Sequence, residues 1–317
     1  MPGGEERVLK RRIASINNTK KITRAMELIA ATRVVKAQQR AAAARPYAEQ
    51  LTGVIEDLAA GGAAPDHPLL SQPEKVNKVG FVLITSDRGL AGPYNSAVIR
   101  ACEREVNALR ASGGDYELVL IGKKAQGYFS FRNYRIHDSF QGISDTPTYE
   151  NARAVAEVVN DLFYNQGIDQ VELVYTQFVS LGVQRPTVRR FLPLEPAEVI
   201  AAEGGGQAEA LAQYEFEPSA EGVLADLLPR YVEARLFAAL LDSAASEHAS
   251  RQRAMKAATD NAEELKTKLT RRMNQARQDA ITTEIMEIVG GAEALGADTS
   301  TTDHHHLPQE LLAQLEA

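Results

Sequence analysis

The chain has 317 residues, of which 44% are hydrophobic and 24% charged, with a net charge of −7. No window approaches about 18 consecutive apolar residues and the N-terminus lacks an apolar signal region, so neither a membrane span nor a secretory signal is predicted. The single Cys102 excludes an internal disulfide and fits a reducing cytoplasmic compartment. Residues 1–50 carry eleven Lys and Arg against four Asp and Glu. The overall acidity argues against a general nucleic-acid binder, whereas the basic terminal regions call for an acidic partner.

A long helix is predicted over residues 1–60. Residues 5–45 contain no Gly or Pro and are dominated by helix-forming residues; Pro46 is expected to kink the helix or to start a new one. Apolar residues recur at steps of three and four, which indicates a coiled-coil seam rather than a broad core face. The expected seam residues are Met26, Ala30, Val34, Ala37, Ala41, Ala44, Ala48, Leu51, Ile55 and Leu58. The basic residues off this seam are Lys20, Lys21, Arg24, Arg33, Lys36 and Arg40. They form either an ordinary solvated face or a surface for acidic loops.

Residues 76–200 are predicted to form a small α/β domain. Residues 78–109 and 116–129 each read as a strand followed by a helix, residues 148–167 as a further helix, and residues 170–179 and 187–194 as strands. Strands that alternate with helices predict a Rossmann-like layer with parallel pairing.

The loop at residues 86–95, SDRGLAGPYN, follows the first strand at the place of a dinucleotide-binding fingerprint. Gly89 and Gly92 do not make G-x-G-x-x-G, Pro93 and Tyr94 crowd the following helix, and no G-x-x-x-x-G-K-[ST] occurs in the chain. The glycines are better explained by backbone conformation, so no nucleotide or other cofactor is expected.

The C-terminal part of the chain is predicted to be a linker, a second long helix and a tail. Residues 201–221 form a Gly-containing linker and contact segment, in which Tyr214 and Glu217 belong either to a strand docked on the sheet or to an exposed contact surface. Residues 222–295 form the helix, with Pro229 as a second expected kink or start. Its expected seam is Met255, Ala258, Ala262, Leu265, Leu269, Met273, Ala276 and Ala280. Residues 296–317 form an acidic tail, expected to be disordered, whose His304–His306 run is read as solvated rather than metal-binding.

The expected fold is therefore α/β: a long antiparallel coiled coil of the N- and C-terminal helices with the small Rossmann-like domain inserted between them. Three stretches, at residues 12–38, 86–95 and 253–295, together resemble the gamma subunit of the bacterial F-type rotary ATP synthase. The resemblance extends over about residues 5–295.

This resemblance implies a non-catalytic rotor shaft that couples rotation of the c-ring to conformational changes at the β-subunit catalytic sites. The implied partners are the α, β and epsilon subunits and the c-ring, with one copy per complex, no nucleic acid and no membrane insertion. The implied location is the cytoplasmic face of the bacterial cell membrane. By match to the family motifs, the β-subunit contacts are Lys21, Arg24, Met26, Arg88, Gly89, Leu90, Ala91, Arg277, Gln278 and Thr282, and the c-ring and epsilon contacts are Tyr214 and Glu217.

The chain departs from the family in two places. Ala91 stands where many members have Cys, and no cysteine pair is present for the thiol control of chloroplast relatives. The tail after residue 295 also continues past the usual end of the family. It is either inert or slows rotation.

Two other functions remain open on the residues alone. The hypothesis of a Rossmann-type enzyme with helical extensions predicts nucleotide binding at residues 86–95. The incomplete dinucleotide-binding fingerprint counts against this hypothesis. The hypothesis of a nucleic-acid module predicts that DNA or RNA binds the basic helix with a steep dependence on salt. The absence of base-stacking aromatic residues in residues 1–45 counts against it.

Overall fold

The computed structural model describes residues 4–60, 67–194 and 219–300 of the chain. It divides into two compact units. One contains residues 24–257, and the other contains residues 1–23 together with 258–317. The two long helices, α1 (Gly4–Ala60) and α6 (Ala220–Ser300), contribute to both units.

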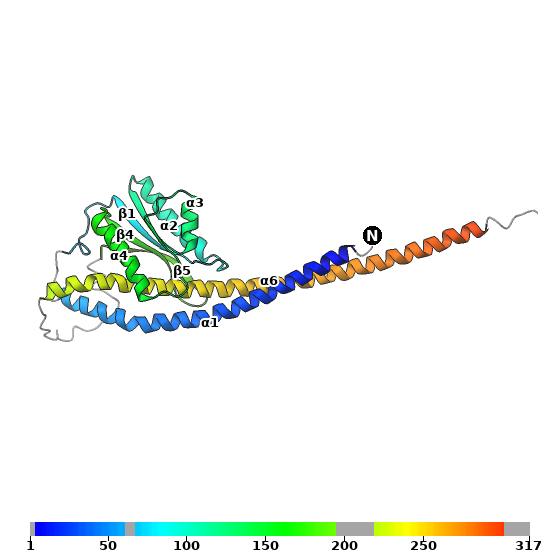
Figure 1. The fold of residues 1–317 in the computed structure, drawn as a ribbon, viewed down its shortest axis with the longest axis horizontal. Coiled ribbons are helices and arrows are strands. Elements are labelled where there is room, and N and C mark those ends of the chain that lie inside the picture. The colour runs from blue at the N-terminus through cyan, green and yellow to red at the C-terminus, as the bar shows by residue number, and fades with distance from the viewer. Residues whose placement is uncertain (1–3, 61–66, 195–218, 301–317) are drawn as a thin grey trace, which may run out of the picture. The chain divides into compact units, whose positions relative to one another are not determined.

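The larger unit is built on a five-stranded sheet, part of which is labelled in Figure 1. The order of its strands is β3-β2-β1-β4-β5. Its elements in chain order are β1 (Lys78–Ile84), α2 (Tyr94–Ala111), β2 (Asp115–Ile121), α3 (Lys123–Phe131), β3 (Asp138–Phe140), α4 (Tyr149–Asn165), β4 (Gln170–Phe178) and β5 (Gln184–Leu192). β1 pairs in parallel with both β2 and β4, and β2 pairs in parallel with β3. The three-residue β3 was absent from the sequence prediction.

The prediction of parallel pairing was wrong for β5, which pairs antiparallel to β4. Only residues 179–183 separate these two strands. A parallel crossover needs roughly a dozen residues or more, so a linker this short permits only a hairpin.

Alternate residues of each central strand enter two different cores. Phe81 and Leu83 of β1 pack with Val98 of α2 and Phe129 of α3. Val82 of β1 faces the opposite core. That core is completed by α4, α1 and α6, through residues that include Val159, Ile55 and Leu236. The sheet is therefore covered on both faces, which explains the nearly continuous apolar sequence of β1.

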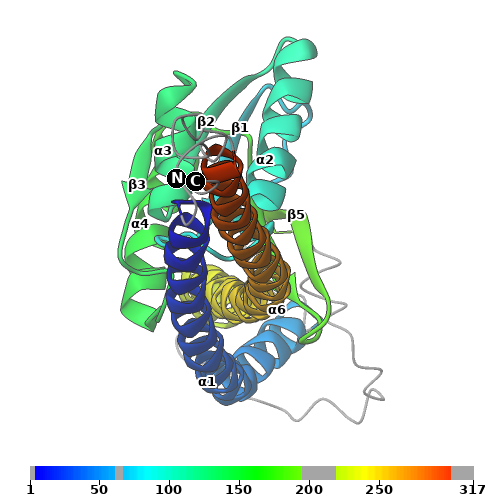
Figure 2. The same ribbon diagram turned by 90° about the vertical axis from the view of Figure 1, so that its right-hand side faces the viewer.

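The antiparallel pairing of α1 and α6 is present within each unit (Figure 2). In the smaller unit Glu5 pairs with Arg272, and Lys20 pairs with Glu263. The residue number of the α6 partner therefore decreases as the residue number along α1 increases. In the larger unit α1 residues 33–40 share a cavity with His248, and residues 41–48 share another with α6 residues 234–242. Neither Pro46 nor Pro229 ends its helix.

The seam of α1 follows the prediction closely. Ala30, Val34, Ala37, Leu51 and Ile55 are buried. Ala41, Ala44 and Ala48 are half-buried. Near the start of this stretch the buried residues are instead Thr23 and Glu27, and Met26 is half-buried. Leu58 has no described side-chain environment.

The predicted seam of α6 was wrong at Leu265, whereas the predicted Ala258 is half-buried. Leu265 is 43% exposed, whereas Thr259 is buried and Lys266 is half-buried. Met273 and Ala280 are both half-buried and stand seven residues apart. Counting back from Met273 in further steps of seven gives Lys266 and Thr259, which therefore occupy the same position of the heptad. The heptad register therefore overrides the hydrophobicity of the neighbouring Leu265.

Candidate contact surfaces and a buried polar junction

The predicted contact residues of α1 are largely on its outer face. Lys21 and Arg24 are exposed and Met26 is half-buried. Arg24 donates to both carboxylate oxygens of Glu27, at 3.0 and 2.9 Å. Lys20 pairs with Glu263 across the seam and Arg33 pairs with Asp145, so these two basic residues are already engaged within the chain. Lys21 is left as the best placed cation of this stretch for an outside partner.

The predicted contact loop at residues 86–95 is braced from within. Asn95 Oδ1 accepts from the Ser86 backbone N–H at 2.9 Å, and Ser86 Oγ donates to the Arg88 carbonyl at 2.5 Å. Arg88 is exposed, and Leu90 is 63% exposed with a left-handed φ of 63°. A non-glycine residue in this conformation costs of order 1 kcal/mol or more, and such strain is typical of functional loops. Ala91 is only 2% exposed and Gly89 is half-buried, so Arg88 and Leu90 form the accessible part of the predicted set.

The third predicted set lies on α6. Arg277, Gln278 and Thr282 are exposed, and the Thr282 hydroxyl donates to the Gln278 carbonyl at 3.0 Å. Every residue from 281 to 295 is exposed. The large apolar members of this stretch are Ile281, Ile285, Met286, Ile288, Val289 and Leu295. Tyr214 and Glu217 lie outside the described residues.

The crevice where a nucleotide binds in many parallel sheets is taken up by α6. In the order β3-β2-β1-β4-β5 that crevice lies beyond the carboxyl ends of β1 and β4. Arg251 of α6 donates to the Gly89 carbonyl at 3.3 Å. A Cβ placed on Gly92 would lie 3.5 Å from the Ala254 Cβ. Because a helix fills this position, the geometry disfavours the alternative of a nucleotide-binding enzyme.

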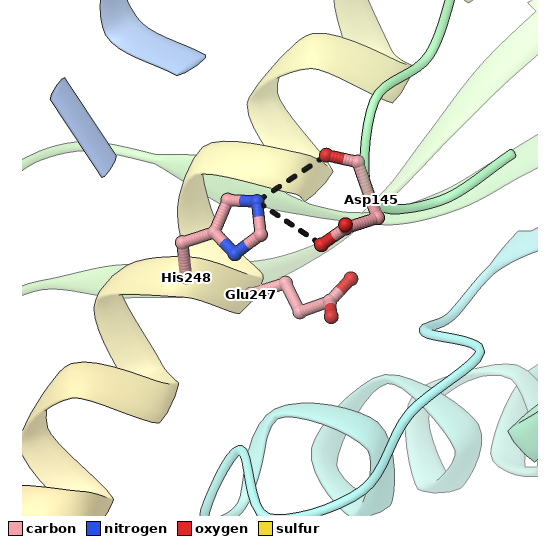
Figure 3. A group of neighbouring side chains, drawn as sticks. All are labelled: Asp145, Glu247 and His248. Atoms are coloured by element: carbon pink, nitrogen blue, oxygen red, sulfur yellow. Dashed lines mark hydrogen bonds and ion pairs between the residues drawn. The ribbon is translucent and has the colours of Figure 1, made fainter. Parts of the chain in front are cut away.

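Where these strands end, the structure brings together a polar junction that sequence reasoning missed. It consists of Asp145 in the loop before α4, Glu247, His248 and Arg251 on α6, and Arg33 on α1 (Figure 3 shows the first three). His248 and Glu247 each have a side chain only 2% exposed, and Arg251 has one 9% exposed. These residues come from three distant parts of the chain and share no motif spacing. The only signal was the polar run SEHASR at residues 246–251, inside the stretch 230–289 that contains no Gly or Pro.

Burial governs the ionisation of this junction. It lowers the pKa of His248, which keeps the imidazole neutral near pH 7. It raises the pKa of Glu247, an effect that the charge and hydrogen bond of Arg251 oppose. Arg251 donates to Glu247 Oε1 at 2.7 Å and to His248 Nδ1 at 3.5 Å. His248 Nε2 then carries the proton and donates to the Asp145 carbonyl at 3.3 Å.

None of the helices in the described parts of the chain has the length and apolarity needed to cross a membrane.

Comparison with known proteins supplies the family. The ATP synthase family profile matches residues 5–295. The ATP synthase gamma chain of Frankia casuarinae is 51% identical over 300 residues, covering 93% of this chain and 99% of the relative. That of Kineococcus radiotolerans is 48% identical over 301 residues, covering 94% and 99%.

Solved structures agree in fold. A chain of the Tetrahymena thermophila mitochondrial ATP synthase central stalk and c-ring matches with a TM-score of 0.56 and 25% identity, covering 75% of this chain and 99% of that one. A chain of the Euglena gracilis mitochondrial ATP synthase matches with a TM-score of 0.66 and 19% identity, covering 97% and 98%. On the family match and the two bacterial relatives, this chain belongs to the ATP synthase gamma-chain family.

Proposed function

We propose that this chain is the central rotor shaft of a proton-driven F-type ATP synthase and couples rotation of the c-ring to conformational changes at the β-subunit catalytic sites. The observation that carries this is the 51% identity to a gamma chain over nearly the whole length of both proteins. The architecture supports it, because two antiparallel helices bracket an inserted α/β domain in the larger unit. The shaft acts mechanically, by biasing the conformational equilibrium of its partners.

The proposed β-subunit contacts are the accessible residues of the three predicted sets. Lys21, Arg24 and Met26 serve on α1, Arg88 and Leu90 on the 86–95 loop, and Arg277, Gln278 and Thr282 on α6. Gly89 and Ala91 support the loop from inside. Tyr214 and Glu217 are proposed, from the family motif alone, to face the c-ring and epsilon subunit.

The exposure of these cations suits a rotor, which must make and break each contact in turn. An exposed ion pair contributes about 0.2–1 kcal/mol, whereas breaking a buried pair costs about 3–5 kcal/mol. Arg24 also has an internal partner whenever an external carboxylate is absent, since its Nη1 donates to both carboxylate oxygens of Glu27.

The proposed assembly contains one copy of this chain with α, β and epsilon subunits and the c-ring. We place it at the cytoplasmic face of a bacterial cell membrane, held there by its partners. The bacterial source of the two relatives supports this location.

The test is co-purification of this chain with matching α and β subunits, followed by measurement of stoichiometry and MgATP hydrolysis. We expect one copy per three α and three β subunits. Arg277→Ala/Gln278→Ala should change turnover severalfold, whereas Arg100→Ala, an exposed arginine on α2, should not. Failure to associate, together with nucleotide bound by the isolated chain, would overturn the proposal.

A further inference from the structure

The polar junction can be interpreted either as a metal site or as an ion-pair network. One ligand atom each from Asp145, Glu247 and His248 lies within 4.8 Å of the others. However, Asp145 already accepts from Arg33, and Glu247 already accepts from Arg251. A divalent cation would have to displace or sit beside two guanidinium groups, so the charges favour the network.

Asp145 joins both long helices at one point. Its carboxylate accepts from Arg33 Nη1 of α1 through both oxygens, one of them at 2.5 Å. On its other side, His248 of α6 donates to the Asp145 carbonyl at 3.3 Å and lies 3.6 Å from Oδ1 of its carboxylate (Figure 3). The helices are therefore bonded to the same residue of the α/β domain.

The loop that carries Asp145 is itself fastened to the sheet. Asp87, just after β1, accepts from the backbone N–H of Gly142 at 2.9 Å and from the Ser144 hydroxyl at 3.0 Å. The same carboxylate accepts from the Lys123 N–H at the start of α3, at 3.1 Å. These hydrogen bonds hold the pKa of Asp87 below its usual value, although burial acts in the opposite direction. The loop that carries Asp145 is thus hydrogen-bonded to the segment that follows β1, and through Asp87 to the start of α3.

A second connection reaches α6 from the 86–95 loop. Arg251 donates to the Gly89 carbonyl and to Glu247, which keeps its guanidinium from turning away. Both loops at the carboxyl edge of the sheet therefore hold α6, and the Asp145 loop also holds α1.

We propose that Asp145 is a positioning residue for torque transmission: by bonding Arg33 of α1 and His248 of α6 at once, it locks the angle of the α/β domain about the two helices. The proposal rests on the rotor function proposed above. The apolar core under α1 and α6 resists separation of the layers, but apolar burial is non-directional and allows small rotation or sliding. Hydrogen bonds weaken steeply when their angle changes, so this cluster supplies the angular stiffness.

The test measures torsional stiffness in a rotor complex assembled with matching α and β subunits. Phe131→Cys, at an 86% exposed position on α3, takes a bead, and Cys102 does not compete because it is 0% exposed. The angular variance of the bead is recorded while the complex is stalled. The variants are Asp145→Asn and Arg33→Gln, which both weaken the bond to α1 and leave the His248 bond to the Asp145 backbone carbonyl in place. The matched control is Glu157→Gln, which removes an exposed ion pair with Arg153 on α4.

We expect about a twofold or larger rise in angular variance for Asp145→Asn and for Arg33→Gln, with partial recovery in Asp145→Glu and no change in Glu157→Gln. A merely structural role would lower the melting temperature without changing the variance. Variance equal to that of the parent in both Asp145→Asn and Arg33→Gln would overturn the assignment. If the parent complex itself fails to assemble or rotate, the failure belongs to the proposed function and not to the role of Asp145.

Discussion

At the residue scale, Asp242 shows how the meeting of two helices changes the chemistry of a single side chain. It lines a cavity of about 550 Å³ between α1 and α6, whose other residues are mainly Ala and aromatic. Burial raises the pKa of Asp242 to about 6, although Arg45 and the backbone N–H of Phe178 act in the opposite direction. The folded chain therefore holds a proton on this carboxyl at pH values where the unfolded chain has released it.

This pKa shift predicts that Asp242→Asn increases the free energy of unfolding by an amount that depends on pH. Between about pH 4 and pH 6 the folded state binds more protons at this site than the unfolded state, so the contribution of Asp242 to stability falls as pH rises through this window. Above pH 6 the folded state bears the cost of a half-buried carboxylate. We expect Asp242→Asn to raise the free energy of unfolding at pH 7 by about 1–2 kcal/mol and to have little effect at pH 4.

Urea unfolding at the two pH values measures this effect. Asp226→Asn, at an exposed position on the same helix, is the control and should show no such difference. If Asp242→Asn is destabilising at pH 7, the pairing with Arg45 outweighs desolvation.

At the element scale, the pairing of α1 with α6 depends on heptad register more than on local hydrophobicity. In the smaller unit the seam contains a buried polar pair, in which the Thr23 and Thr259 hydroxyls lie 2.8 Å apart. Thr23 also donates to the Lys20 carbonyl, at 3.1 Å. The Thr23–Thr259 bond requires one alignment of the two helices, so it favours register at some cost in apolar burial.

The pair predicts non-additive substitution effects. Thr23→Val or Thr259→Val alone removes the cross-helix hydrogen bond and should cost about 1 kcal/mol. The double variant removes both hydroxyls and should be neutral or stabilising. Thermal unfolding of the four chains completes the double-mutant cycle, with Thr19→Val on the exposed face as control. Equal and additive losses would show that the hydroxyl contact is not coupled across the seam.

At the scale of the whole molecule, part of α6 presents apolar side chains that the described residues do not cover. Residues 281–295 of α6 are exposed along their whole length, and Ile281, Ile285 and Ile288 follow one another at steps of four and three. An apolar stripe of this kind is typical of a helix that lies against partners. Among residues 4–60, 67–194 and 219–300, this apolar stripe therefore has no packing partner.

This exposed apolar stripe predicts that a substitution can impair assembly with partner subunits without impairing folding of the chain. Ile285→Asp/Ile288→Asp should leave the melting temperature of the isolated chain within about 2 °C, because exposed substitutions are usually within about 0.5 kcal/mol of neutral. The same variant should reduce recovery of the complex with α and β subunits severalfold. Glu284→Asp/Glu287→Asp, on the same stretch, is the control. Normal recovery of the double aspartate variant would show that this stripe is not covered in the assembly.

The sequence by itself determined what depends on local periodicity. The long helices follow from runs without Gly or Pro, the α1 seam from its heptads, and the strand–helix alternation from short apolar runs. The contact residues were chosen through family motifs, and their contacts remain predictions. The antiparallel β5 could also have been foreseen, since the length of the connection decides it.

Only the tertiary structure decided the features that join distant segments. The α6 seam passes through Lys266 rather than Leu265, and it includes the buried Thr259, because the partner helix, and not residue hydrophobicity, sets its phase. The crevice above β1 is filled by α6. Arg33, Asp145 and His248 meet although more than 100 residues separate Asp145 from each of the others. No sequence periodicity records such a meeting, because it results from three elements packing at one edge of the sheet.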